Sequence, residues 1–222
     1  MQKNPYKGKL ITFEGLDGSG LTTQAELLMD WITETTRGQV LAYLTKEPTD
    51  GPAGGQIRLG LAQRLEIDEE ALALLFAADR MDHLNRCIIP RLKDGIHVIC
   101  DRYYLSSFAY QSLKVPFEWL KQINNRCIRP DLTIVLKVPP SICVRRMAKE
   151  RFGVARYEYE PQLQEVWRKY LEIIPKLREE GERIEIIDGN DPIQIVHHKV
   201  VRLVQEVIPV LKSNAWQPRL LG

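Results

Sequence analysis

The fold is decided by residues 15–24, "GLDGSGLTTQ", a glycine-rich stretch. An apolar run, "KLITFE" at 9–14, precedes it, and the helix-like pattern "LTTQAELLMDWI" opens within it. A strand, a glycine-rich turn and a helix in this order are typical of a phosphate-binding loop, whose consensus is G-x-x-x-x-G-K-[ST]. Both glycines of that consensus are present, and so is its hydroxyl residue, Thr22. Leu21, however, stands at the position of the lysine.

The glycines of this stretch allow the backbone to wrap closely around an anion. Backbone N–H groups and the N-terminus of the following helix then point at phosphate. We therefore expect Leu21 to affect the rate of a reaction more than nucleotide binding. Asp17 is an unusual carboxylate beside phosphates, and it would face a metal ion, a water molecule or a sugar hydroxyl. A plain strand-to-helix turn would also use glycine, but the position after a first strand favours phosphate binding.

Five short segments, rich in β-branched residues and almost continuously apolar, have the pattern of parallel strands that are covered on both faces. They are 9–14, 40–45, 96–101, 132–138 and 183–187. Helix-like patterns lie between or after them, at 22–36, 68–93 (one helix or two), 105–114, 117–127, 140–150, 160–180 and 192–212. This alternation predicts an α/β fold with a five-stranded parallel sheet, doubly wound by helices.

Length and composition are those of a single soluble domain, with 222 residues, 44% apolar and 27% charged. The net charge of +2 gives no global attraction to nucleic acid, and we expect none as a partner. The four cysteines lack the spacing of a zinc or redox motif, which favours reduced, intracellular thiols. With no signal peptide and no apolar run of about 18 residues, we expect a cytoplasmic protein that binds no membrane.

Ligands of such sheets bind at the carboxyl ends of the strands. Asp101 ends the third strand, where it could hold Mg²⁺, and Arg102 follows it; a structural ion pair is the alternative. Phe76 and Arg80 are one helical turn apart and share a face. A ring there can stack on a base while the guanidinium takes a phosphate. Taken alone, this second pair fits a core phenylalanine and a surface arginine better.

Six motifs in order make the pattern specific: "FEGLDGSG", "KEP", "LLFAADR", "DRYYLSSFAYQ", "RPDLTIVLKVPP" and "ARYE". With them the chain resembles the thymidylate kinases, P-loop nucleoside monophosphate kinases that phosphorylate dTMP with ATP. The resemblance spans about residues 9–205, and the fourth motif is the most discriminating. It implies one P-loop kinase domain over 1–222 with a short lid, ATP and Mg²⁺ as cofactors, dTMP as substrate, and a homodimer.

The resemblance also implies roles for particular residues. The donor phosphates would be held by Gly15, Gly18, Ser19, Gly20, Leu21, Thr22 and Thr23. The acceptor would be bound by Glu47, Phe76, Arg80, Arg102, Ser107, Tyr110 and Gln111. In that set Phe76 would stack on thymine, and Arg80 and Arg102 would grip the phosphate. Thr22 and Asp101 would hold the metal, and Asp17 would sit between the two nucleotides.

The stretch 145–158, "RRMAKERFGVARYE", corresponds to the lid of that family, which ends in D-R-[FY]-E. Ala155 replaces the acid. Family members carry a catalytic arginine either in the phosphate loop or in the lid. Because Gly18 follows Asp17 in this loop, the candidates are Arg151 and Arg156, beside Asp17 and Arg102 as the other catalytic residues.

Two alternatives to an active dTMP kinase remain open at this stage. Leu21 and Ala155 are compatible with a nucleotide-binding homologue that is weakly active or not catalytic. The same chemistry on another nucleoside monophosphate is the second alternative, since pocket residues set the acceptor.

Overall fold

The structure is a computed structural model, and it describes residues 1–150 and 159–212, without the side chains of residues 149 and 150. Its centre is a five-stranded sheet in the order β3-β4-β2-β6-β7, and every neighbouring pair is parallel. The strands are β2 (Leu10–Gly15), β3 (Ala42–Lys46), β4 (His97–Asp101), β6 (Leu132–Lys137) and β7 (Ile184–Asp188). The predicted fold class is confirmed, and each predicted strand lies within two residues of its observed position.

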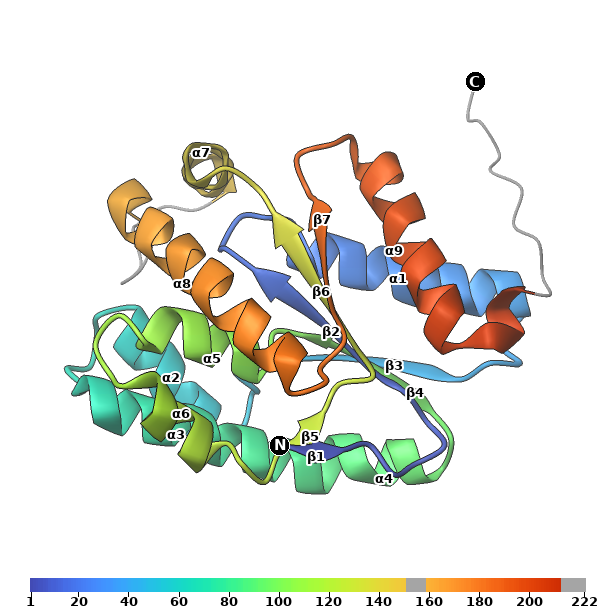
Figure 1. The fold of residues 1–222 in the computed structure, drawn as a ribbon, viewed down its shortest axis with the longest axis horizontal. Coiled ribbons are helices and arrows are strands. Elements are labelled where there is room, and N and C mark those ends of the chain that lie inside the picture. The colour runs from blue at the N-terminus through green and yellow to red at the C-terminus, as the bar shows by residue number, and fades with distance from the viewer. Residues whose placement is uncertain (151–158, 213–222) are drawn as a thin grey trace.

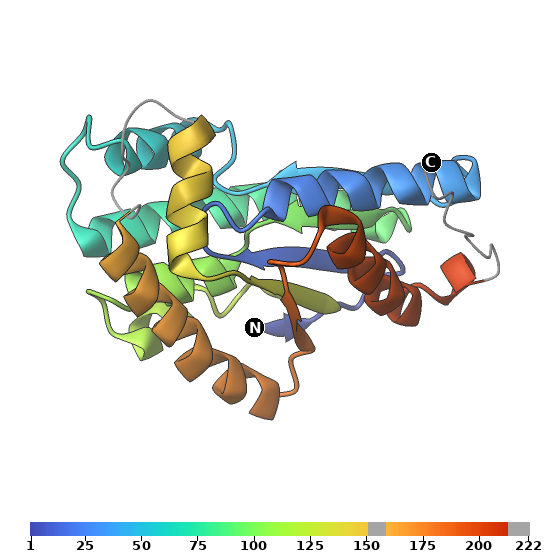
Figure 2. The same ribbon diagram turned by 90° about the horizontal axis from the view of Figure 1, so that it is seen from above.

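Helices cover both faces of the sheet. Figure 1 shows α1 (Leu21–Thr36) and α9 (Ile193–Val207) packed together on one face. The other face carries α3 (Glu69–His83), α5 (Tyr104–Gln111) and α8 (Glu160–Glu179), and Figure 2 gives the same layers from above. The remaining helices are α2 (Pro52–Leu61), α4 (Ile89–Lys93), α6 (Phe117–Ile123) and α7 (Pro140–Glu150), with a π-helical turn at Leu84–Ile88 and a 3₁₀ turn at Pro209–Lys212.

The core consists of two apolar layers, one on each side of the sheet. Along β6, Ile134 and Leu136 pack into the layer under α1 and α9, and Val135 packs into the layer under α5 and α8. Successive side chains of a strand point to opposite faces. Both faces of β6 are therefore buried, which explains why the strand segments are almost continuously apolar in sequence.

Three features of the fold were not predicted. Helix α2 is one, and a second is a short parallel pair, β1 (Gln2–Lys3) with β5 (Ile128–Arg129). The third is the 3₁₀ turn at the end of the predicted helix at 192–212; the segment 68–93, expected to form one or two helices, contains α3 and α4 with the π-helical turn between them. None of the helices in the described part of the chain has the length and apolar character needed to cross a bilayer.

Candidate active site

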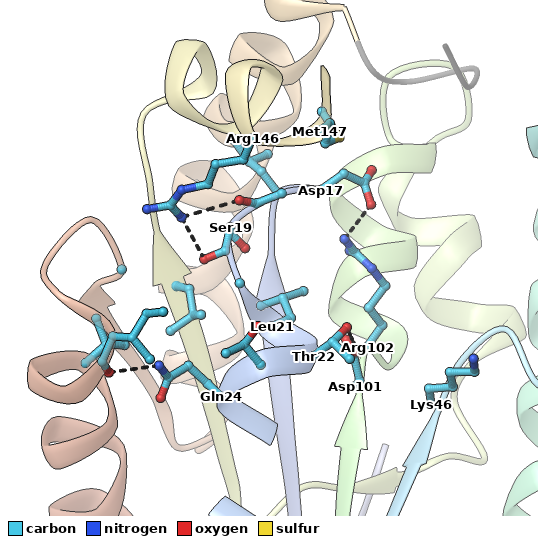
Figure 3. A pocket seen from close by; sticks show the side chains of 18 of the residues that line it. Asp17, Ser19, Leu21, Thr22, Gln24, Lys46, Asp101, Arg102, Arg146 and Met147 are labelled. Atoms are coloured by element: carbon cyan, nitrogen blue, oxygen red, sulfur yellow. Dashed lines mark hydrogen bonds and ion pairs between the residues drawn. The ribbon is translucent and has the colours of Figure 1, made fainter. Parts of the chain in front are cut away.

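A cavity of about 500 Å³ lies above the carboxyl ends of β2 and β4, next to the point where the strand order reverses. Ligands of open parallel sheets bind at such a point. All predicted loop residues from Gly18 to Thr23 line the cavity, as do Asp17, Glu47, Asp101 and Arg102, and Figure 3 shows many of them. Gly15 lies just behind it, at the end of β2.

The loop backbone is shaped for a close approach. Gly18 has φ of +76°, and a Cβ there would lie 2.7 Å from the carbonyl oxygen of Cys143. Any larger residue would therefore be strained and would also collide with α7. Ser19 is 2% exposed, and its Oγ has no hydrogen-bond partner among the described residues. An unpaired buried hydroxyl just before the N-terminus of α1 fits a phosphate as the missing partner.

Leu21 contributes no charge to this loop. It is the first residue of α1, it is 5% exposed, and it belongs to the apolar layer under α1 and α9. Its side chain therefore forms part of the floor of the cavity. The loop presents backbone dipoles and hydroxyl groups to a phosphate, and no cation of its own.

Thr22 and Asp101, the two residues that the sequence predicted as metal ligands, lie side by side. The Oγ1 of Thr22 donates a hydrogen bond of 2.5 Å to Oδ2 of Asp101. A hydroxyl and a carboxylate side by side are oxygen ligands of the kind that Mg²⁺ prefers beside substrate phosphates. These residues therefore fit such an ion.

Asp17 and Arg102 face each other across the loop, and Arg102 donates to Oδ1 of Asp17 at 2.7 Å. Tyr110 closes the group, since its hydroxyl donates to Oδ2 of Asp17 at 3.0 Å and accepts from the backbone N–H of Asp17 at 2.9 Å. Burial would lower the pKa of Arg102, but the charge of Asp17 raises that pKa well above its usual value. Arg102 is therefore a permanent cation at the edge of the cavity.

A second polar cluster lies deeper, around Arg80. This side chain is 1% exposed and donates to Glu47 at 2.7 Å, to Asn124 at 2.6 Å and to Ser107 at 2.9 Å. His83 lies 3.0 Å from the other oxygen of Glu47. Burial lowers the pKa of His83, but contacts with Cys87 and Glu47 raise it to about 9. Two cations therefore hold the one carboxylate of Glu47.

Gln111 ends α5 with an unsatisfied amide. It is 2% exposed, and neither its Nε2 nor its Oε1 has a hydrogen-bond partner among the described residues. Both a donor and an acceptor are thus free in a buried position, which suits the edge of a heterocyclic base. Ser107 and Tyr110 lie on the same helix, and Phe76 lies half-buried on α3, which packs against α5.

The predicted residues in the described part of the chain, apart from Phe76 and Gln111, form two connected groups. The first, which lines the cavity, contains Asp17, the phosphate loop, Asp101 and Arg102. The second contains Glu47, Arg80 and Ser107, and Glu47 belongs to both because it also lines the cavity. Arg151 and Arg156 lie outside the described residues, as does most of the predicted lid.

Sequence reasoning missed three residues near this site: Lys46, Asn124 and Arg146. Lys46 ends β3 and Arg146 lies on α7, and both line the cavity. Lys46 was detectable, because it directly follows an apolar strand. Asn124 carried no such signal, since it contacts Arg80 from 44 positions away in the chain.

A phosphate loop at the switch point of a parallel sheet, a hydroxyl–carboxylate pair beside it and an arginine opposite define a class: P-loop phosphotransferases of the nucleoside monophosphate kinase type.

Comparison with known proteins narrows this class. The family model described as thymidylate kinase matches residues 13–200. A probable thymidylate kinase of Pyrococcus abyssi is 40% identical, over 90% of this chain and 97% of that protein. One of Thermococcus kodakarensis is 36% identical, over 89% and 98%. The thymidylate kinase of Symbiobacterium thermophilum is 36% identical, over 90% and 94%. The chain belongs to the thymidylate kinase family.

Proposed function

We propose that the protein transfers the γ-phosphoryl group of ATP to dTMP, giving ADP and dTDP, with Mg²⁺ bound by Thr22 and Asp101. The observation that carries the proposal is the placement of Arg102 opposite the phosphate loop, beside the Thr22–Asp101 pair. A donor phosphate on the loop and an acceptor phosphate on Arg102 would meet in one cavity. Membership of the family supplies dTMP as the acceptor.

The residues position and neutralise charge, since phosphoryl transfer needs little covalent chemistry from the protein. An oxygen of the dTMP phosphate attacks the γ-phosphorus in line, and the bond to the bridging oxygen of ADP breaks. The attacking oxygen is already ionised, so no side chain acts as a strong base. Mg²⁺ supplies charge neutralisation for the donor phosphates when bound. Asp17 keeps Arg102 in place through an ion pair of 2.7 Å.

For the acceptor, we propose that Phe76 stacks on thymine while Ser107, Tyr110 and Gln111 line the base and sugar. The unpaired amide of Gln111 supports this, because it offers one donor and one acceptor to a base edge. Arg102 is the better phosphate ligand of the two arginines. Arg102 lines the cavity, whereas Arg80 is 1% exposed and does not. Each already makes three hydrogen bonds, so each would bind the phosphate through its remaining N–H groups.

Several further expectations belong to this proposal. Arg151 and Arg156 are proposed as catalytic arginines of a lid over about residues 145–158, and the whole chain as one kinase domain. We also propose a cytoplasmic homodimer that binds no nucleic acid, with the interface on helices of 68–93 and 105–127. Leu74 supports that interface, because half of its surface is exposed on α3. Light scattering after size-exclusion chromatography would give the mass and test the dimer.

The test of activity is ADP release in a coupled assay with ATP and Mg²⁺, using dTMP, dUMP, dCMP and dGMP as acceptors. We expect turnover with dTMP at the highest kcat/KM. Preference for another acceptor would favour the alternative kinase, and absence of turnover with tight dTMP binding would favour a non-catalytic homologue.

A variant links the acceptor proposal to the structure. Gln111→Leu should raise KM for dTMP more than tenfold with little change in KM for ATP, because a site built to hydrogen-bond a base discriminates strongly. Unchanged KM for dTMP in a folded variant, checked by circular dichroism, would remove Gln111 from the base site.

A further inference from the structure

The phosphate loop lacks a cation at position 21, yet its cavity is not free of positive charge. Among the side chains of residues 1–148 and 159–212, three basic ones line it: Lys46, Arg102 and Arg146. Charge neutralisation of the transferred group is the main task of protein residues in phosphoryl transfer. The position of these three side chains therefore decides which of them can neutralise the charge of the transferred phosphoryl group.

Two of the three are already engaged. Arg102 donates to Asp17, to Ser106 and to the carbonyl oxygen of Gly15. Arg146 lies against the outside of the loop, with Nη1 3.4 Å and 3.5 Å from two loop carbonyl oxygens. Figure 3 shows its guanidinium on the side of the loop away from Thr22 and Asp101.

Lys46 is differently placed. It is the last residue of β3, and its Cα partner across the ladder is Asp101 of β4. Its side chain is exposed and makes no hydrogen bond or ion pair with any described residue. The carboxylates around it have other partners, since Asp101 accepts from Thr22 and Glu47 holds Arg80 and His83. Among the described residues the ammonium group of Lys46 is thus unpaired, and Lys46 lies beside Asp101 of the proposed metal-binding pair.

A second cavity, of about 460 Å³, reinforces this placement. Lys46, Thr22 and Asp101 line both cavities, so the three side chains form the wall between them. Figure 3 shows Lys46 on the far side of Asp101 from the loop. A phosphoryl group that is transferred from a donor nucleotide on the loop to an acceptor phosphate at Arg102 would pass close to these three side chains.

We propose that Lys46 is a catalytic residue, and that its ammonium group contacts the transferred phosphoryl group in place of the missing loop lysine. The inference rests on the proposed function. A lysine ammonium is a compact point charge, which suits an anion whose charge is spread over three oxygens. Leu21 is then free to pack in the apolar layer, because the cation comes from the neighbouring strand instead of from α1.

The first test is Lys46→Met in the full-length protein. We expect kcat to fall about 10²-fold, as when one positioned donor is removed from a charged transition state, with KM for dTMP changing by less than about threefold. Lys46→Arg should retain more activity than Lys46→Met. The matched control is Lys137→Met, because Lys137 also ends a strand, is exposed, and lines neither cavity; its kcat should equal that of the wild type.

The second test asks whether a lysine at position 21 of the loop restores the activity that Lys46→Met loses. Leu21→Lys added to Lys46→Met should raise kcat at least tenfold above that of Lys46→Met alone. Absence of rescue, or a Lys46→Met variant with raised KM for dTMP and normal kcat, would overturn the proposal. In the second case Lys46 would bind the acceptor only.

A binding measurement tests the contact between Lys46 and the transferred phosphoryl group independently of the proposed kinase activity. By calorimetry, Lys46→Met should weaken binding of a non-hydrolysable ATP analogue about tenfold, with ADP binding unchanged, because ADP lacks the phosphate that Lys46 contacts. Equal losses for both nucleotides, or none, would overturn the proposal. A wild type without turnover that still shows the selective loss would reject the kinase activity and the catalytic role, and would support only the contact of Lys46 with the third phosphate of ATP.

Discussion

At the scale of single residues, Arg102 shows how the chain turns a side chain toward the site. Its φ is +69°, a left-handed conformation that disfavours residues other than glycine by about 1–2 kcal/mol. Its backbone N–H donates to the carbonyl oxygen of Phe13 at 2.9 Å, and its guanidinium binds Asp17, Gly15 and Ser106. The left-handed turn between β4 and α5 is thus compensated by contacts that aim the guanidinium at the loop.

This geometry makes Arg102 hard to replace by another cation. We expect Arg102→Lys to lower kcat/KM for dTMP by about 10²-fold, because lysine has no planar fork to span Asp17, Ser106 and a phosphate. Steady-state kinetics would measure the change. Arg202→Lys, exposed on α9 and not lining the cavity, is the control and should behave as the wild type. Equal kinetics of the two variants would show that any cation suffices at position 102.

The sequence predicted which residue types gather at the active-site cavity, and the structure adds which partner each side chain contacts. Asp17, Thr22, Asp101 and Arg102 were expected near one another because each follows or precedes a strand end. Lys46 occupies an equivalent position, but sequence gives no sign that Asp101 already has Thr22 as a partner. Which charges remain unpaired is a three-dimensional property, and it is the one on which the proposed catalytic role depends.

At the scale of elements, α2 depends on tertiary contacts more than on its own sequence. The helix contains three glycines in ten residues, each costing about 1 kcal/mol relative to alanine. That composition explains why the pattern did not predict it. Packing against α3 supplies the stability, with Ile57 fully buried. Gly54 permits this packing, because a Cβ there would lie 1.9 Å from the carbonyl oxygen of Thr49.

Two adjacent glycines of α2 therefore predict opposite effects. Gly54→Ala should destabilise the protein by about 1–3 kcal/mol, as overpacking does, because it displaces Thr49 and its hydrogen bonds to Asp79. Gly55→Ala should stabilise it by about 0.5–1 kcal/mol, since nothing lies within 4 Å of the added methyl group. Urea unfolding would measure both. A Gly54→Ala protein as stable as Gly55→Ala would mean that the segment at 47–51 yields freely.

At the scale of the whole molecule, the two apolar layers share one sheet, so we expect them to unfold together. The layers contain separate reporters: Trp31 lies in the layer under α1 and α9, and Trp167 packs against the other. The continuous apolar strands made this architecture the most predictable part of the protein, because a strand buried on both faces admits few arrangements. The buried ionisable groups were not predictable, since burial depends on the packing of all layers.

Three of those groups couple the stability of the whole fold to pH. Burial raises the pKa of Glu14 to about 8, against hydrogen bonds and charges that lower it. The pKa of His83 is raised to about 9, and burial lowers that of His197 to about 4. Groups with raised pKa hold protons in the folded state that the unfolded state releases, so their contribution to stability is lost as pH rises. His197 acts oppositely, and its contribution is lost as pH falls from about 6.5 to 4.

The free energy of unfolding should therefore fall as pH rises from about 6.5 to 8.5, where the folded state holds up to two protons more than the unfolded one, through Glu14 and His83. Glu14→Gln, which resembles the protonated carboxyl group, should roughly halve this slope. Glu34→Gln, exposed on α1, should leave it unchanged. Urea titrations followed by tryptophan fluorescence at several pH values would measure the slopes. An unaltered slope in Glu14→Gln would mean that the buried carboxyl group under the phosphate loop is ionised throughout this range, stabilised by Arg102 more than it is opposed by burial.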